Sequence, residues 1–411
     1  MKNHLKASFF IAFSMTILVL LYEEIALTLF SSDLNNDGFG VPKSSFTYKL
    51  ASEDPLYRVN MLIAVSSRLS TLHDKLYKIG IYTSIGCLIL LDTPRLLVHK
   101  LCNKSVNFYT ETYFNINHIQ LAIANLFVFL FTIFYLSEYV ENILEITKYN
   151  WVSKVGTYFV LYSIVCPAFV FIVFFLLRTF GAQLILAIYI SLILKNFYEI
   201  FIEDDVSSTL KQVSKNRFSK TVQEKLIETK LDKKVFFDTD KSKDTNAALV
   251  GIENSARIEI YGDFDNLDEE QKDSILLHEI GHAIDHSLLK KLSVYFGTYF
   301  IELSIMIFLY GKAAKAFECE KINRYTAFVL LSIVYFLSMK DWIMMFYKMS
   351  SQRAEIAADL LTKSSGFGKE LALSLYDIST SEKSYIRPTW LYNALHAVHP
   401  SIYDRIEYLN K

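Results

Sequence analysis

Apolar residues gather along the chain in seven stretches, each close to the length that a membrane-spanning helix needs. About 20 predominantly apolar residues cross a bilayer as a helix. Stretches of this kind occupy residues 8–30, 79–98, 119–140, 155–177, 180–200, 293–311 and 325–346. The third to sixth carry almost no charge. The pattern therefore predicts an α-helical integral membrane protein with about seven transmembrane helices.

The first stretch contains Glu23 and Glu24, the second contains Asp92, and the last contains Lys340 and Asp341. Ionisable groups at membrane depth usually face a bundle interior or a water-filled cavity. The alternative is that these spans are simply shorter, and the pattern alone leaves both interpretations open.

The spans divide the chain into four parts. Residues 1–198 hold helices one to five with their loops, 199–292 are mostly polar, 293–346 hold helices six and seven, and 347–411 are polar again. Because two spans separate the two polar parts, both lie on one side of the membrane and can build one site. The bias of Lys and Arg between the short loops is poor, and only the basic region 195–243 favours the cytosolic side.

The first polar part has a local pattern of its own. Residues 247–251 and 257–261 predict a β pair, and the turn-forming residues 252–255 between them suit a hairpin. A helix is expected from about Leu267 to Leu289, with Asp268 as its N-cap before acidic first-turn residues. The sequence thus predicts a mostly helical domain with a short β-sheet.

Composition excludes several other classes of protein. Hydrophobic residues make up 52% of the 411 residues, and 42 basic side chains nearly balance 43 acidic ones. Such a balance gives no global positive field for nucleic acid. Two of the four cysteines, Cys87 and Cys166, lie in apolar runs, which argues against a disulfide framework.

The run His278-Glu279-Ile280-Gly281-His282 carries the candidate chemistry. On a helix, positions i and i+4 share a face, so both imidazoles converge on one metal ion. Glu279 lies beside the metal, where it can accept a proton from zinc-bound water. The pentapeptide fixes only three positions and also occurs by chance, but here it lies on a credible helix.

A third ligand is available in the second polar part. Glu355 would complete a His-His-Glu set around one Zn²⁺ ion and leave a position open for water. Asp359 lies one turn later on the same face, where it would fix the tautomer of an imidazole. The alternative is a solvated acidic face, which the small apolar residues between the two carboxylates make less favourable.

Other histidines carry weaker signals. His286 follows His282 by one turn, but a fourth protein ligand would close the site, so we expect a supporting or structural role. His399 precedes Pro400 and is followed by Arg405. An imidazole and a guanidinium at these positions could stabilise the oxyanion of a tetrahedral intermediate.

With these residues the sequence resembles the type I CAAX prenyl protease family of eukaryotic membranes, the farnesylated-protein-converting zinc endopeptidases. Four blocks in chain order carry the resemblance: 246–251 with 257–261, 278–282 with His286, 355–359, and 391–400 ending in Arg405-Ile406. The last block is the most specific, because chance rarely supplies it downstream of the other three.

The resemblance implies a fold and an activity. Family members form a ring of seven helices around a large water-filled chamber, capped by a gluzincin-type zinc domain at the cytosolic end. They cleave farnesylated CAAX proteins after the modified cysteine and release the last three residues. By the same resemblance, Asn246 would bind the substrate backbone, and His399 and Arg405 would assist the transition state. The expected location is the endoplasmic reticulum membrane or the inner nuclear membrane.

The sequence also departs from the family pattern. The family usually has an arginine three residues before the ligand glutamate, where this chain has Gln352, and Arg353 follows one position later. Ala248 and Leu249 stand where the family has aromatic residues. These departures affect the expected substrate fit more than the zinc chemistry.

Two other functions compete with prenyl-protein cleavage. One is a zinc protease for membrane-protein quality control, resembling bacterial heat-shock membrane metalloproteases, but those have fewer spans. The other is a non-enzymatic zinc-binding membrane scaffold, which the full set of candidate ligands, base and oxyanion residues disfavours. We expect a lipid bilayer and prenylated protein substrates as partners, and no nucleic acid.

Overall fold

A computed structural model of the chain describes residues 2–90, 182–201, 210–238, 246–252, 255–262, 264–316 and 339–411, with single positions in between. The chain divides into two compact units. One unit comprises residues 1–13, 77–191 and 301–339, and the other comprises 14–76, 192–300 and 340–411. The second unit contains every residue predicted for the site.

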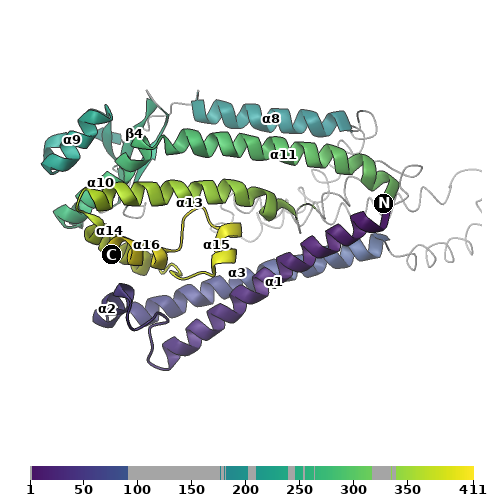
Figure 1. The fold of residues 1–411 in the computed structure, drawn as a ribbon, viewed down its shortest axis with the longest axis horizontal. Helices are drawn as coiled ribbons and strands as arrows, with labels where there is room; N and C mark the ends of the chain where they lie inside the picture. The colour runs from purple at the N-terminus through teal and green to yellow at the C-terminus, as the bar shows by residue number, and fades with distance from the viewer. Residues whose placement is uncertain are drawn as a thin grey trace, which may run out of the picture. The chain divides into compact units, whose positions relative to one another are not determined.

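Four long helices dominate the described residues: α1 (Lys2–Asn35), α3 (Tyr57–Leu90), α8 (Ala182–Phe201) and α11 (Ser287–Ala316) (Figure 1). A short helix, α2 (Phe46–Glu53), precedes α3. Two segments, Ile11–Asn35 and Ser287–Tyr310, are long and apolar enough to cross a membrane. Of the predicted spans, 119–140, nearly all of 155–177 and most of 325–346 lie outside the described residues. The count of seven spans therefore stays a prediction.

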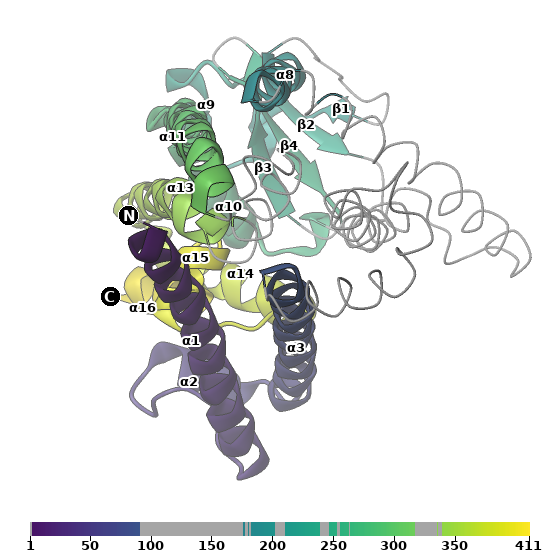
Figure 2. The ribbon, with the colours of Figure 1, turned by 90° about the vertical axis from the view of Figure 1, so that its right-hand side faces the viewer.

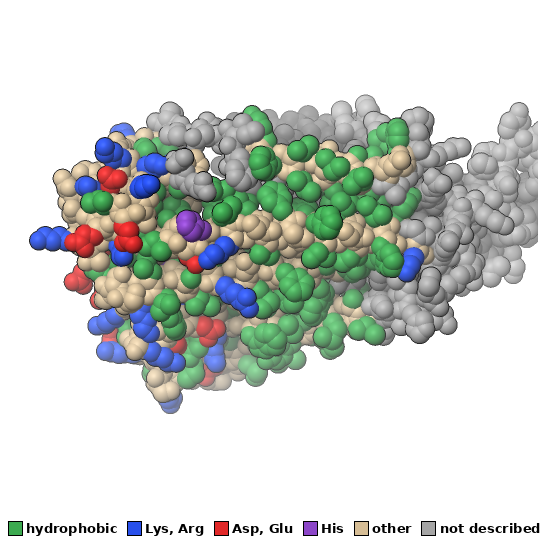
Figure 3. Space-filling model, turned by 45° about the horizontal axis from the view of Figure 1, so that its top comes forward, with side chains coloured by type: hydrophobic (Ala, Val, Ile, Leu, Met, Phe, Trp, Pro, Cys, Tyr) green, Lys and Arg blue, Asp and Glu red, His purple; other side chains and the backbone are tan. Residues whose placement is uncertain are grey.

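Many large apolar side chains on these helices are exposed. In the face drawn in Figure 3, they dominate along the long helices, while charged side chains gather at the left end. In Figure 1 this end carries α9 (Lys220–Glu228). Exposed members on α1 and α11 include Leu18, Ile25, Leu29, Phe300 and Phe308. Contiguous exposed apolar surface of this kind is typical of contact with a membrane or a partner.

A four-stranded sheet forms the β part of the second unit. Its strands are β1 (Leu210–Gln212), β2 (Val235–Asp238), β3 (Asn246–Val250) and β4 (Arg257–Tyr261), in the order β1-β2-β4-β3. The β3–β4 pair is antiparallel, as predicted, and β2 pairs with β4 in parallel. The sequence did not predict β1 and β2. Strand β3 is an edge strand and lies on the side of α10 (Figure 2).

The β3–β4 register runs from Asn246 opposite Tyr261 to Val250 opposite Arg257. Gly251 ends the first strand with φ of 82°, a left-handed conformation that favours glycine. A Cβ there would lie 2.5 Å from the carbonyl oxygen of Ser255, so the turn has no room for one. The local turn chemistry thus fixes the pairing that the sequence pattern predicted.

The predicted helix from Leu267 to Leu289 is in fact two helices. Helix α10 (Glu269–Ile284) begins after Asp268, whose N–H donates to Gln271 Oε1 at 3.3 Å. It ends where His286 adopts φ of 50°, and α11 begins at Ser287. The N–H of His286 donates to the Ala283 carbonyl instead of continuing the helical pattern. Neither glycine nor proline marks this break, so the sequence pattern missed it.

The C-terminal part supplies four further helices, α13 (Lys340–Ser364), α14 (Gly368–Ser381), α15 (Trp390–His396) and α16 (Ile402–Asn410). Helix α10 packs against α13 and α14. At the crossing with α13, a Cβ on Gly281 would lie 2.8 Å from the Cα of Ala358. Glycine therefore allows the close approach that joins the two polar parts of the chain.

The acidic residues predicted at membrane depth have polar partners where the structure describes them. Glu23 is fully buried and accepts the N–H of Thr389 at 2.8 Å. Glu24 lies 2.9 Å from His73 Nε2, and Asp341 contacts Lys348 and His396. Asp92 lies outside the described residues. The burial of Glu23 agrees with the interpretation that it faces an interior, whereas the side chains of Glu24 and Asp341 are 32% and 41% exposed.

Candidate metal centre

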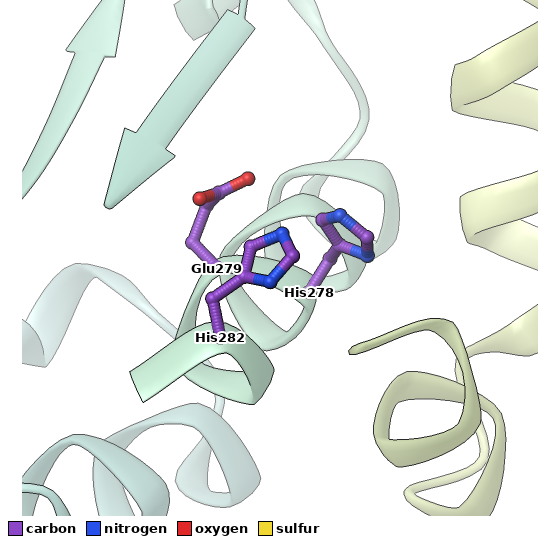
Figure 4. Close-up of side chains that lie close together, drawn as sticks. All are labelled: His278, Glu279 and His282. Atoms are coloured by element: carbon purple, nitrogen blue, oxygen red, sulfur yellow. The ribbon is translucent and has the colours of Figure 1, made fainter. Parts of the chain in front are cut away.

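Helix α10 presents two imidazoles from successive turns. His278 and His282 are 6% and 9% exposed, and their ring centroids lie 4.8 Å apart. Figure 4 shows both rings on the same side of the helix, with Glu279 beside them and pointing toward the strands. Ile275, Leu276 and Ile280 bury the rest of the helix in the core. The amphipathic packing of α10 thus decides which way the imidazoles point.

Glu355 on α13 faces both rings. Its Oε2 lies 3.4 Å from His278 Nε2, and its Oε1 lies 3.4 Å from His282 Nε2. Burial alone would raise the pKa of this carboxyl group, but hydrogen bonds from the imidazoles hold the pKa well below its usual range. Two imidazole nitrogens and a buried carboxylate converging on one point are a donor set that fits Zn²⁺.

Asp359 contacts the ligand His278, and Arg405 in turn binds Asp359. Asp359 Oδ1 lies 3.0 Å from His278 Nδ1, and Arg405 donates from Nε and Nη2 to the two oxygens of Asp359, each at 2.8 Å. Burial would raise the pKa of Asp359, but the charge of Arg405 lowers it. All three side chains are buried, so this arrangement fixes the orientation of His278.

The carboxylates also change the proton affinity of the ligand set. Burial would lower the pKa of His278, but Asp359 and Glu355 outweigh it and raise the pKa to about 9. Without a metal, the imidazole therefore keeps a second proton near neutral pH. A metal ion that binds here has to displace that proton, so its affinity rises with pH.

Glu279 is tied to the edge of the sheet. Its Oε2 accepts the N–H of Leu249 on β3 at 2.7 Å. Two residues earlier, the N–H of Ala247 donates to the side-chain oxygen of Asn246 at 2.8 Å. Both backbone donors on this edge therefore have acceptors already, and a peptide arriving there would find carbonyl oxygens to bind.

A cavity of about 680 Å³ joins these groups. The predicted site residues in its wall are Asn246, His278, Glu279, His282, Glu355, His399 and Arg405. The volume is within the usual range for ligand sites in proteins. The structure thus brings together seven of the residues that the sequence singled out.

His399 reaches the cavity from the segment after α15. Its Nδ1 lies 3.1 Å from Glu355 Oε2, and its side chain is 59% exposed. Gln352 on α13 holds this segment, because its Nε2 donates to the carbonyls of Asn393 and Ala397 at 3.0 and 2.9 Å. The departure from the family pattern at Gln352 is therefore a structural contact within the site.

His286 is not brought to the cavity. It is exposed at the break between α10 and α11, and no described ligand side chain contacts it. Sequence reasoning missed Lys291, whose Nζ lies 3.2 Å from Glu355 Oε1. The predicted helix runs without a break from Leu267 to Leu289, so it does not indicate that Lys291, beyond the break at His286, would lie beside Glu355. Arg68, which also lines the cavity, gave no signal in this role.

Comparisons with known proteins agree with this geometry. Residues 214–411 match the family model described as peptidase family M48. The crystal structure of S. mikatae Ste24p matches with a TM-score of 0.54 and 15% identity, over 98% of this chain and 99% of that chain. No curated protein is similar enough in sequence to match.

The matches confirm that the chain resembles the type I CAAX prenyl protease family. The structural likeness supports a Ste24p-like fold, mostly helical with a small sheet. The family match covers the part of the chain that holds all the candidate ligands, and it supports a zinc metalloprotease. Together the two findings support a metalloprotease with a Ste24p-like fold.

Proposed function

We propose that the chain is a membrane-embedded zinc endopeptidase that removes the C-terminal tripeptide from farnesylated CAAX proteins. The observation that carries the proposal is the convergence of His278, His282 and Glu355 in a cavity where Glu279 is held against an edge strand. Three protein ligands leave one position for catalysis.

One Zn²⁺ ion would be held by the two imidazoles and Glu355. When bound, zinc supplies a Lewis acid that acidifies water and polarises a peptide carbonyl. Asp359 fixes the ring of His278, and Arg405 fixes Asp359 in turn. Because the guanidinium is already engaged by Asp359, we propose that Arg405 positions the ligands rather than meeting the substrate oxyanion.

Glu279 acts as the general base. The Leu249 N–H holds one carboxylate oxygen, so the other is free to take a proton from the attacking water. The substrate peptide adds to the edge of β3, where it donates to backbone carbonyls. Asn246 begins that strand and lines the cavity, which suits contact with the substrate backbone.

His399 is the candidate for stabilising the transition state. Its imidazole is more than half exposed, lines the cavity and lies beside Glu355. A donor at this position can meet the negative charge that develops on the substrate carbonyl. His286 stays outside this scheme with a structural role at the helix break.

The remaining parts of the proposal concern the membrane. We propose seven spans around a chamber, with the site facing the cytosol from the endoplasmic reticulum membrane. The chain would then divide into residues 1–198, 199–292, 293–346 and 347–411. Apolar chamber walls would bind the farnesyl chain, because each buried methylene contributes about 0.8 kcal/mol. Selectivity then comes from the lipid, since an edge strand distinguishes few sequences.

The test combines metal analysis with peptide cleavage. Purified protein should contain one zinc per chain and cleave a farnesylated CAAX peptide after the modified cysteine, with much higher kcat/KM than its unprenylated twin. His282→Ala should lose zinc and activity together. Equal rates on both peptides, or cuts scattered along an unfolded membrane protein, would instead favour the quality-control protease. Full zinc occupancy with no hydrolysis would favour the scaffold.

A further inference from the structure

Arg68 on α3 lines the same cavity as the candidate ligands. Its guanidinium carbon lies 4.4 Å from the centre of the Tyr392 ring, a stacked position that keeps the planar group in place. Its Nε is buried and has no hydrogen-bond partner. Within the described residues, no carboxylate oxygen lies at ion-pair distance from this guanidinium.

The other two cations in the described cavity wall are already paired. Arg405 donates twice to Asp359, and Lys291 lies 3.2 Å from Glu355. Arg68 has no ion-pair partner among the described residues, so the charge of its guanidinium is left for a ligand in the cavity. Arg68 is thus the cavity cation whose hydrogen-bonding capacity is left for a bound molecule.

The surroundings of Arg68 carry an excess of positive charge. Lys75 Nζ lies 3.4 Å from the Tyr392 hydroxyl, and Lys348 lies 3.4 Å from Asp341. His396 also contacts Asp341, but burial and the nearby lysines lower its pKa to about 4, so it is neutral at pH 7. Arg68, Lys75 and Lys348 thus outnumber Asp341 and the buried Glu23, which accepts the Thr389 N–H. Of these groups only Arg68 lines the cavity, so an anionic ligand there would meet Arg68 directly.

We propose that Arg68 binds the C-terminal carboxylate of the peptide substrate, so that the cavity recognises the end of a chain. This inference rests on the proposed function and names the substrate feature that the site selects. A guanidinium binds a carboxylate through two parallel hydrogen bonds, and stacking on Tyr392 holds it ready.

The proposal sets the length of peptide that lies between Arg68 and the cleaved bond. Three extended residues span about 10 Å, at roughly 3.3–3.6 Å each. The proposal requires the bond three residues upstream to reach Glu279 and the metal ligands, which line the same cavity as Arg68. The cavity that contains both groups, about 680 Å³ in volume, is large enough for a short peptide.

The experiment compares two farnesylated peptides that differ only at the C-terminus, one a free acid and the other a primary amide. The wild-type protein should cleave the acid with at least about tenfold higher kcat/KM, corresponding to roughly 1.4 kcal/mol. Arg68→Met should bring the acid-to-amide ratio close to one, mainly through KM, and Arg68→Lys should retain part of the preference.

Arg58→Met is the matched control. Arg58 lies on the same helix, stacks on Phe39 at 4.9 Å and is paired with Asp37, but it does not line the cavity. It should keep the wild-type acid-to-amide ratio. An Arg68→Met variant that loses activity on both peptides equally would show a structural role and overturn the inference, as would a wild-type protein without a preference for the acid.

A binding measurement separates this inference from the proposed function. The free apolar tripeptide acid and its amide are titrated into zinc-loaded Glu279→Gln protein, with and without Arg68→Met. Binding of the acid that depends on Arg68 supports the carboxylate site even if no peptide is cleaved. Cleavage of farnesylated peptides without any acid preference leaves the protease function in place and removes the role of Arg68.

Discussion

The two ends of the cavity differ in how their charges are matched. At the ligand end, Glu355 contacts two imidazoles, and Asp359 contacts both His278 and Arg405. At the other end, Arg68 stacks on Tyr392 and keeps an unpartnered Nε. The charged groups at the ligand end pair with one another, whereas Arg68 has no ion-pair partner among the described residues.

This difference suggests two roles: the paired charges hold the metal ligands in position, whereas Arg68 recognises the substrate. Buried charges that satisfy one another fix side-chain positions, and breaking such a set leaves an uncompensated charge behind. A cation in the cavity wall that has no ion-pair partner among the described residues can instead pair with an anionic ligand. Substitutions at the matched end should therefore change metal binding, turnover or stability, whereas those at Arg68 should change which peptide end is preferred.

The largest effect is expected at Glu279. Glu279→Gln keeps an oxygen for the Leu249 N–H but cannot take a proton from water. Turnover should fall by about 100- to 10,000-fold, while zinc content and melting temperature stay close to wild type. Glu269→Gln on the same helix, an exposed partner of Lys272, should have no effect. Near-normal turnover in Glu279→Gln would assign the base to another group.

The second largest effect is expected at Asp359, which pairs with His278 and Arg405. Asp359→Asn removes the carboxylate that faces His278 and accepts two hydrogen bonds from the buried Arg405, which keeps only Glu355 at 3.7 Å among the described residues. Zinc affinity should fall by about 10- to 100-fold, and unfolding free energy by about 3–5 kcal/mol. Competition with a chelator measures the first, and thermal melting in detergent reports the second.

Asp285→Asn is the control for that experiment. Asp285 pairs with Lys290, whose side chain is 61% exposed, so the loss should be below about 1 kcal/mol. If Asp359→Asn changed zinc affinity no more than Asp285→Asn, the idea that paired charges hold the ligands would fail.

Local patterns predicted the parts of the site that lie within one element. The spacing of His278 and His282, the N-cap at Asp268 and the β3–β4 pair each depend on neighbouring residues, and the structure contains all three features. The extent of the helix was wrong, because the left-handed residue His286 follows no glycine or proline signal. Strand β1 has only three residues, too few for an alternating pattern to stand out.

Contacts between distant elements were harder to predict. Lys291 meets Glu355 only because α11 changes direction, and Arg68 meets Tyr392 across more than 300 positions of sequence. Gln352 was noticed as a departure from the family pattern, but its bonds to Asn393 and Ala397 depend on tertiary packing. Sequence spacing gave no sign of these pairings.

A smaller effect is expected at Gly281, which sets the distance between the two ligand helices. Gly281→Ala places a Cβ 2.8 Å from the Cα of Ala358, so α10 and α13 must separate. Overpacking of this kind costs about 1–3 kcal/mol, and it moves Glu355 away from the imidazoles. Melting temperature and zinc affinity should both fall.

Gly297→Ala provides the opposite case. A Cβ on Gly297, within α11, would meet nothing within 4 Å. Alanine is also a better helix former than glycine by about 0.5–1 kcal/mol, so stability should not fall. Equal losses in the two variants would mean that the α10–α13 distance does not control the ligand end.

The smallest effect is expected at Gln352, which ties α13 to the segment that carries His399. Gln352→Ala removes the donor to two carbonyls, a loss of about 0.5–1.5 kcal/mol for each net hydrogen bond. Because the metal ligands are not touched, zinc content should stay constant while kcat falls a few-fold through misplacement of His399. Arg353→Ala is the matched control, since Arg353 is the exposed neighbour on the same helix. A defect in Arg353→Ala but not in Gln352→Ala would mean that the shifted arginine, and not Gln352, supports the site.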